Sequence, residues 1–199
     1  MSHEPELLPL LGEPPRERSD AARNRDALMC AAKELVDSAG VDAVTMDAVA
    51  ERAGVGKGTV FRRFGSRAGL MAALLDASEA AWQGDVMGGP PPLGPGAPPR
   101  ERLLAFGRSR LVGNLERAAL VQAATGAQPR SYAAYSFTAT HVRYLLHELG
   151  VRGDIDLLTT ALLAPLEVPI LLQQTQIEGI DVDRIVAGWE DLVARVVDA

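Results

Sequence analysis

The chain has 199 residues, of which 47% are hydrophobic, and a formal net charge of −6, so it can build one large or two small domains around a sizeable core. An acidic balance argues against a protein that binds nucleic acid over its whole surface. The charge is uneven, because residues 16–67 hold ten basic and eight acidic side chains, whereas residues 68–199 hold ten and fifteen. This pattern indicates a mildly basic head on an acidic body, which fits local contact with DNA.

Cysteine usage and hydropathy bear on the compartment. Cys30 is the only cysteine, so an internal disulfide is excluded and a reducing cytoplasm is compatible. Its Ala-rich helical surroundings predict a small core residue. No apolar run reaches the roughly 18–20 residues of a membrane span, and the N-terminus lacks the pattern of a signal peptide. We therefore expect a cytoplasmic protein without membrane contact, and the excess of Arg over Lys suggests a G+C-rich bacterial genome.

The N-terminal part begins with an irregular segment. Residues 1–18 contain four prolines among charged residues and are predicted to form a flexible tail. Ser19 or Asp20 can cap the helix that follows. Its apolar residues recur at spacings of three and four, which predicts an amphipathic helix ending at Gly40; they are Ala27, Leu28, Ala31, Ala32, Leu35 and Val36.

The stretch 44–70 reads VTMDAVAERAGVGKGTVFRRFGSRAGL. Thr45 can cap a helix whose apolar positions are 46, 49, 50 and 53. Gly54 can take the positive φ of a sharp turn, and a second helix resumes with three candidate inward residues, Val60, Phe61 and Phe64. Two short helices joined by a glycine turn predict a helix-turn-helix, whose second helix enters the major groove. An ordinary pair of packed helices with a solvated basic face remains the alternative.

The front of the second helix is suited to phosphate contact. Gly56 and Gly58 remove side chains there, so that backbone N–H groups can approach a phosphate. Basic side chains nearby would neutralise phosphates, and Thr59 could contact a phosphate or a thymine methyl group. The candidate DNA-facing residues are Thr45, Gly56, Lys57, Gly58, Thr59, Phe61, Arg62, Arg63 and Arg67.

The wider pattern AxxLxxxxGVDAVTMDAVAERAGVGKGTVFRRFGSRAGLM resembles the N-terminal domain of the tetracycline-repressor-like (TetR) family from Arg23 to Leu74, most specifically from Ala50 to Phe64. The resemblance implies a DNA-binding regulator whose fourth helix links the DNA-binding domain to the body. Arg67 occupies the place of a basic residue that commonly meets the phosphate backbone. The chain departs from the family at Phe61, where a tyrosine hydroxyl would bond a phosphate.

The remaining segments predict helices. Ser66 can cap a fourth helix running to about Gly84, and residues 84–99 are dense in Gly and Pro, which predicts a loop that cannot carry a helix. Later segments have helical period and no strand signal: they are 100–114, 115–125, 131–149, 154–177 and 181–197. Pro165 and Pro169 predict kinks in the long segment. We thus predict an all-α protein of about nine helices, with residues 19–66 as the helix-turn-helix domain and 67–199 as a ligand-binding and dimerisation domain.

The TetR resemblance implies a small-molecule site among the middle helices of the body and a homodimer. Candidate ligand-binding residues combine aromatic walls with a few polar groups: they are Phe106, Arg110, Phe137, His141, Tyr144 and Gln173. Each can equally be a plain core or surface residue. Segments 154–177 and 181–197 correspond to the helices that pack against a twofold mate. Their apolar residues exceed what one small core needs and are Leu162, Leu163, Leu166, Val168, Ile170, Leu171, Leu172, Trp189 and Val193.

The sequence gives no indication of catalysis. No GxSxG, P-loop, HExxH, CxxC or GxGxxG motif occurs. His141 and His147 lie six residues apart on different helix faces, which makes them a poor metal pair. Asp154 and Asp156 fit helix capping better than acid–base chemistry. We predict no enzyme, no catalytic residue, no metal site and no cofactor.

These observations predict a homodimeric transcriptional regulator, an effector-released repressor that binds a pseudo-palindromic double-stranded DNA operator. A small molecule of unknown identity would be its effector. The alternative is a helical small-molecule-binding or protein-interaction module whose DNA contact is vestigial. Retardation of DNA from the region upstream of its own coding sequence separates the two hypotheses.

Overall fold

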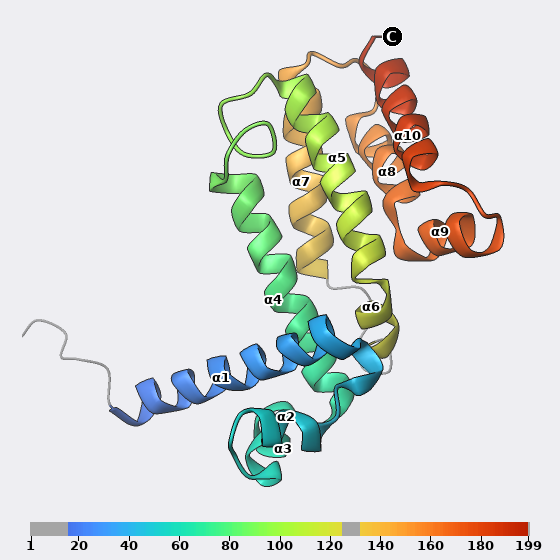
Figure 1. Ribbon diagram of the computed structural model, residues 1–199. Helices are drawn as coiled ribbons and strands as arrows, with labels where there is room; N and C mark the ends of the chain where they lie inside the picture. Colours follow the sequence, from blue (N-terminus) through green and yellow to red (C-terminus); the bar gives the residue numbers. More distant parts are fainter. Residues whose placement is uncertain (1–15, 125–131, 199) are drawn as a thin grey trace, which may run out of the picture. The chain divides into compact units, whose positions relative to one another are not determined.

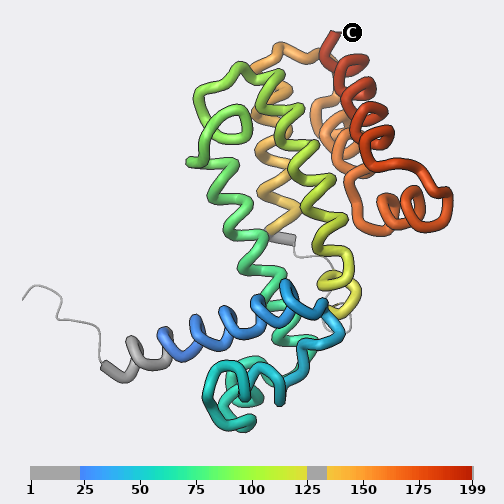
Figure 2. The backbone as a smooth tube through the Cα atoms, viewed as in Figure 1, coloured from blue at the N-terminus to red at the C-terminus, as the bar shows by residue number. Residues whose placement is uncertain are grey.

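The computed structural model describes residues 16–124 and 132–198. This part of the chain contains helices joined by turns and loops, and no strand (Figure 1). The all-α prediction is confirmed, and the described residues form ten α-helices where the sequence predicts about nine in all. The chain forms two compact units that divide between Gly65 and Ser66. The tube in Figure 2 follows the same course of the backbone.

The first unit contains α1 (Arg16–Ala39), a 3₁₀ turn (Val41–Ala43), α2 (Met46–Arg52) and α3 (Lys57–Phe64). Helix α1 stops at Gly40, whose φ of 80° lies in the left-handed region that glycine adopts without strain. The helix begins at Arg16, so residues 16–18 are helical and do not belong to a tail as we predicted; residues 1–15 lie outside the described part.

The buried face of α1 corrects one prediction. Leu28, Ala31, Ala32 and Leu35 are buried as expected, but Cys30 is exposed. Because successive helical residues are about 100° apart, Cys30 lies about 200° around the axis from Leu28 and falls outside the stripe that the buried residues form.

Helix α4 (Arg67–Gly88) begins the second unit and extends beyond its predicted end at Gly84. The prediction that residues 84–99 carry no helix is therefore wrong for 84–88. A single glycine inside a helix destabilises it by only about 1 kcal/mol relative to alanine. The burial of Trp82 and Val86 in the core outweighs this loss and lets the helix continue past Gly84. The loop covers residues 89–98, and Pro99 then starts α5 (Pro99–Glu116), where its missing N–H group is not needed.

The rest of the second unit consists of α6 (Ala118–Ala124), α7 (Tyr132–Glu148), α8 (Ile155–Leu163), a 3₁₀ turn (Ala164–Leu166), α9 (Val168–Leu172), a π-helical turn (Gln173–Ile177) and α10 (Val182–Val197). The interruption predicted at Pro165 and Pro169 is confirmed, because residues 155–166 and 168–177 meet at a bend of 42°. Asp154 and Asp181 cap α8 and α10 by accepting hydrogen bonds from the N–H groups of Leu157 and Asp183.

The core of the second unit lies among α4, α5, α7, α8 and α10. The α10 residue Trp189 is 4% exposed and donates its Nε1 hydrogen to the carbonyl oxygen of Leu162 at 2.8 Å. Its ring lies against α5 at Gly107, where an added Cβ would stand 1.9 Å from the indole. Glycine is therefore required at 107 to let the two helices approach this closely.

The apolar residues of α8–α10 correct a second interpretation. Leu162, Leu163, Leu166, Leu171 and Trp189 are buried within the unit's own core, so they are not surplus to it. Of the predicted set, Ile170 is exposed, at 40%, and the segments also leave three large apolar side chains exposed that were not in it: Leu157 at 67%, Ile177 at 73% and Val182 at 36%. Among the described residues, no single helix has the length and apolar character needed to cross a membrane, although the bent pair 155–166 and 168–177 has them jointly.

Candidate nucleic-acid interface and effector site

The turn between α2 and α3 has the predicted local geometry. The Thr45 hydroxyl accepts a hydrogen bond from the Ala48 N–H group at 3.0 Å and so caps α2. Gly54 has φ 67°, and the Val55 N–H group donates to the Ala50 carbonyl oxygen at 2.9 Å. Val60 is fully buried. These contacts fix how α3 leaves the turn and which of its faces points outward.

The outward face of α3 is basic and open. Gly56 is the N-cap of the helix, and a Cβ added at Gly56 or Gly58 would meet no atom within 4 Å. The Arg62 guanidinium donates to the Gly58 carbonyl oxygen at 3.3 Å and to the Thr59 hydroxyl at 3.4 Å. Lys57, Arg62 and Arg63 are exposed and Thr59 is half-buried. The predicted DNA-facing residues of this helix therefore lie together on an accessible surface.

Phe61 differs from one of its two predicted placements. It is 42% exposed, so it is not an inward residue. Val60 and Phe64 are four residues apart and share the inner stripe, whereas Phe61 lies about 100° away from Val60. The ammonium group of Lys57 stands 5.8 Å from the centroid of the Phe61 ring, which is within the range of a cation–π contact.

An acidic residue that the sequence reasoning missed occupies the same surface. Asp47, in the first turn of α2, forms an ion pair with Lys57 at 2.7 Å, and their side chains are 65% and 58% exposed. A carboxylate paired with a lysine that is predicted to bind phosphate would compete with phosphate for that lysine. The turn that brings α2 against α3 creates this pair, and the ten-residue spacing gives no indication of it.

Two more predicted residues lie outside this helix. Thr45 is exposed, but its hydroxyl already holds the α2 cap. Arg67 is the first residue of α4, in the second unit, and is half-buried. Ser66 caps α4 as predicted, because its hydroxyl accepts from the Gly69 N–H group at 3.1 Å.

The second unit gathers aromatic rings between α4, α5 and α7. The Phe106 ring is fully buried and lies 5.1 Å from the rings of Trp82 and His141. The Phe137 ring is 6.1 Å from Trp82 and stacks on His141 at 6.2 Å. Phe106, Phe137 and His141, three of the predicted ligand residues, are thus brought together, and Trp82 joins them.

His141 is buried among these rings at 8% exposure. Burial lowers the pKa of His141 to about 4, and the positive charge of Arg102 acts in the same direction. The imidazole is therefore neutral at pH 7. Its Nε2 atom has no hydrogen-bond partner within the described part of the chain.

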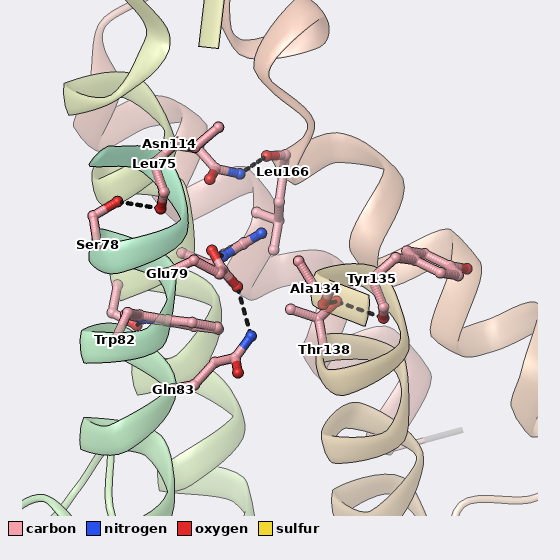
Figure 3. A network of polar contacts seen from close by, with 12 residues as sticks. Leu75, Ser78, Glu79, Trp82, Gln83, Asn114, Ala134, Tyr135, Thr138 and Leu166 are labelled. Carbon is pink, nitrogen blue, oxygen red and sulfur yellow. Dashed lines mark hydrogen bonds and ion pairs between the residues drawn. The ribbon is translucent and has the colours of Figure 1, made fainter. Parts of the chain in front are cut away.

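A polar group adjoins the aromatic rings on α4 and α5. The Glu79 carboxylate accepts from Arg110 at 2.5 Å and from Gln83 at 3.1 Å, and the Arg110 guanidinium lies 4.7 Å from the centroid of the Trp82 ring. Figure 3 shows Glu79, Trp82 and Gln83 projecting from α4 on the side that faces Thr138 of α7. The sequence analysis missed Glu79 and Trp82, although their three-residue spacing on one helix places them on a common face.

Arg117 is a further residue that the sequence analysis did not select. Its side chain folds back onto α5 at Gly113, where an added Cβ would stand 2.8 Å from the Arg117 Nη2 atom. That nitrogen is buried and has no hydrogen-bond partner among residues 16–124 and 132–198. Burial lowers the pKa of Arg117, and the charge of Arg110 lowers it further, while Glu79 and Glu116 raise it.

The last two predicted ligand residues lie apart from this group or at its edge. Gln173 is exposed on the π-helical turn, where its side chain donates to Glu178 at 3.4 Å. Tyr144 is 48% exposed, with its ring 6.4 Å from His141. A separate pocket of about 280 Å³ lies between α5, the 3₁₀ turn Ala164–Leu166, the π-helical turn and α10. Its lining residues include Leu111, Gln174, Arg184 and Trp189. The described residues contain no cluster of His, Cys, Asp or Glu that could hold a metal ion.

An all-helical chain with an N-terminal helix-turn-helix unit and a separate helical body has the architecture of two-domain DNA-binding regulators. Residues 28–74 match the profile of bacterial regulatory proteins of the tetR family. This match confirms the resemblance to the TetR family that the sequence predicted for the N-terminal domain.

Solved structures share the whole fold at low sequence identity. A Saccharomonospora viridis structure with bound choline is 19% identical, with a TM-score of 0.65 over 86% of this chain and 96% of that one. A TetR-family transcriptional regulator from Pectobacterium atrosepticum is 18% identical, with a TM-score of 0.64 over 88% and 93%. The SmeT–triclosan complex is 15% identical, with a TM-score of 0.56 over 87% and 90%. No curated protein matches the chain.

Proposed function

We propose that this protein is a transcriptional repressor that binds a pseudo-palindromic operator as a homodimer and is released by a small-molecule effector. The observation that carries the proposal is the outward face of α3, where Lys57, Arg62 and Arg63 are exposed above a buried Val60. Such a helix places cationic side chains against phosphates on either side of a major groove. The TetR-family match over residues 28–74 supports the same role.

Within the interface, the proposed roles follow from chemistry and position. Lys57 and the arginines 62, 63 and 67 neutralise phosphates, and Arg62 or Arg63 reaches a base edge. Gly56 and Gly58 let backbone N–H groups approach a phosphate, because nothing stands within 4 Å of the space a Cβ would take. Thr45 and Thr59 contribute hydroxyl contacts, and Phe61 contributes an apolar surface without the tyrosine hydroxyl.

The effector would bind in the helical body. Structures with the same fold contain choline and triclosan, two small molecules that differ in charge and polarity. In this chain Phe106, Phe137 and His141 form a ring cluster with Arg110 beside it, and Tyr144 lies at its edge. We retain Gln173 as a weaker candidate, because it lies on the π-helical turn and bonds Glu178.

Dimerisation through residues 154–177 and 181–197 is part of the proposal. Its support is the set of exposed apolar side chains on these segments, chiefly Leu157 and Ile177. A twofold dimer presents two α3 helices to successive major grooves, about 34–36 Å apart. An effector that favours a different separation of the two helices would release the operator by shifting the population of conformers.

The test is retardation of DNA from the region upstream of the protein's own coding sequence, at several salt concentrations. Lys57→Ala should weaken binding and lower the slope of log affinity against log salt by about 1, as expected for one lost phosphate contact. The matched control is Lys33→Ala, which removes the other of the two lysines from an exposed position on α1. No retardation at low salt, with or without candidate effectors, would favour a small-molecule-binding or protein-interaction module instead.

A further inference from the structure

We propose that the effector is a small organic anion, a carboxylate on an aromatic or aliphatic body, and that the Arg117 guanidinium anchors it. The inference rests on the proposed function, since it names the ligand class of the effector site. It concerns α4, α5 and the junction of α5 with α6, where Glu79, Arg110, Trp82 and Arg117 lie.

Two guanidinium groups, those of Arg110 and Arg117, lie near the carboxylate of Glu79, while the Glu116 carboxylate that also acts on Arg117 is exposed to solvent. Both oxygens of the Glu79 carboxylate are engaged, one by Arg110 at 2.5 Å and the other by Gln83 at 3.1 Å. The side chains of Arg110 and Glu79 are only 13% and 16% exposed, so bulk water screens them weakly. Arg117 therefore adds a second guanidinium beside a carboxylate whose two oxygens already accept from Arg110 and Gln83.

The position of Arg117 is held at a cost to stability. Its Nη2 atom is buried without a partner in the described part of the chain, and a buried unpaired donor is destabilising. It reaches this position only because residue 113 is a glycine, which the interior of a helix disfavours; a Cβ there would stand 2.8 Å from Nη2. A ligand oxygen that accepts a hydrogen bond from Nη2 would remove the cost of the unpaired donor. It would also explain why a glycine stands at position 113, where it leaves room for the guanidinium.

The surroundings select the rest of the ligand. A carboxylate matches the planar fork of a guanidinium and is attracted by both Arg110 and Arg117. The half-buried Phe137 ring, 6.1 Å from the Trp82 ring on which Arg110 lies, offers an apolar surface for the ligand body. A quaternary ammonium ion would instead meet two positive charges, and its place over the Trp82 ring is already taken by the Arg110 guanidinium at 4.7 Å.

Ligand binding to the full chain tests the inference with sodium octanoate and sodium benzoate as probes. Thermal unfolding and calorimetric titration would be compared with sodium chloride and choline chloride at equal ionic strength. At least one carboxylate should raise Tm, and Arg117→Gln should weaken its Kd roughly tenfold or more, because a charge-assisted hydrogen bond is lost. Arg108→Gln is the matched control, since Arg108 lies on the same helix but pairs with Glu190 and is 61% exposed.

Gly113→Ala separates ligand recognition from folding. Its methyl group should displace the Arg117 guanidinium and weaken carboxylate binding, while alanine favours the helix and should not lower the Tm of the unliganded protein. A Tm shift by carboxylates that is equal in the wild type and in both variants would overturn the inference, as would a shift with choline chloride alone.

The two proposals fail in different ways. If wild-type protein retards the upstream DNA but neither carboxylate shifts Tm, the anion site is wrong and the regulator remains. If a carboxylate binds in an Arg117-dependent way but no DNA is retarded at low salt, the anion site stands and the proposed operator binding is wrong.

Discussion

The helix-turn-helix unit and the helical body use their polar side chains in opposite ways. In the first unit Arg62 contacts Gly58 and Thr59 on its own helix, and both partners of the Lys57–Asp47 pair between α3 and α2 are more than half exposed. In the second unit the polar contacts join distant segments, such as Trp82 with Ser109 and Trp189 with Leu162. Substitutions on α3 should therefore change DNA affinity, whereas substitutions in the body should change stability or ligand binding.

The largest effect should come from Trp189. Trp189→Ala removes a buried ring that packs on Gly107 and should lower the free energy of unfolding by about 3–5 kcal/mol. Trp189→Phe keeps most of the packing but leaves the Leu162 carbonyl oxygen without its donor, for a loss of about 1–3 kcal/mol. Urea unfolding followed by circular dichroism measures both. Equal losses in the two variants would show that ring volume at this position is unimportant.

The buried imidazole should make stability depend on pH. The folded-state pKa of His141, about 4, lies below the ordinary value of 6.5, so the unfolded chain binds the extra proton between these values. Stability should therefore fall as pH drops from 6.5 to 4 and level off below, by at most about 3 kcal/mol from this residue.

Urea midpoints between pH 7.5 and 4 measure this dependence. His141→Gln should flatten the curve relative to the wild type, while His147→Gln, at an exposed site on the same helix, should leave it unchanged. A curve of the same steepness in the His141 and His147 variants would contradict the assignment of this slope to His141.

The cap of α2 should have a moderate effect within the first unit. Thr45→Ala removes the hydroxyl that accepts from the Ala48 N–H group and should cost about 1 kcal/mol of stability. Thr45→Ser retains the hydroxyl and should recover most of the loss. Hydrogen exchange of the Ala48 amide, measured in the two variants, checks the mechanism: a rate that is unchanged in Thr45→Ala would mean that the cap contributes nothing.

The smallest effect should come from Asp47, and it has the opposite sign on DNA binding. Asp47→Asn releases Lys57 from an exposed ion pair worth no more than about 1 kcal/mol, so operator affinity should rise by up to about fivefold. Glu51→Gln removes one negative charge from an exposed position on the same helix and serves as the control. Equal gains in operator affinity in both variants would mean that the change in net charge, and not the release of Lys57, causes the effect.

The sequence predicted the first unit nearly residue by residue, because the signals there are local. The Thr45 cap, the Gly54 turn and the buried Val60 each depend on neighbours within a few positions. The errors concern apolar residues that lie next to the buried stripe of their helix. The sequence pattern predicts Phe61 and Cys30 as inward residues, yet each lies outside the stripe formed by its buried neighbours.

The body was predictable in its helices but not in its site. Helical period located α5, α7 and α10, and the bend between α8 and α9 follows from the prolines at 165 and 169. Helix α4 continues past Gly84 because the burial of Val86 outweighs the low helix propensity of glycine. The saturation of Glu79, the unpaired Arg117 nitrogen and the role of Gly113 depend on contacts between helices, which residue types alone do not encode.

The sequence by itself determined the all-α fold and the basic tip of the helix-turn-helix, since both arise from interactions within one or two helical turns. Only the tertiary structure decided which apolar residues of the last helices belong to the core, which carboxylate opposes Lys57, and that the Nη2 atom of Arg117 is left without a partner in the described part of the chain. Those outcomes depend on side chains that meet across helices, where distance in space is unrelated to distance along the chain.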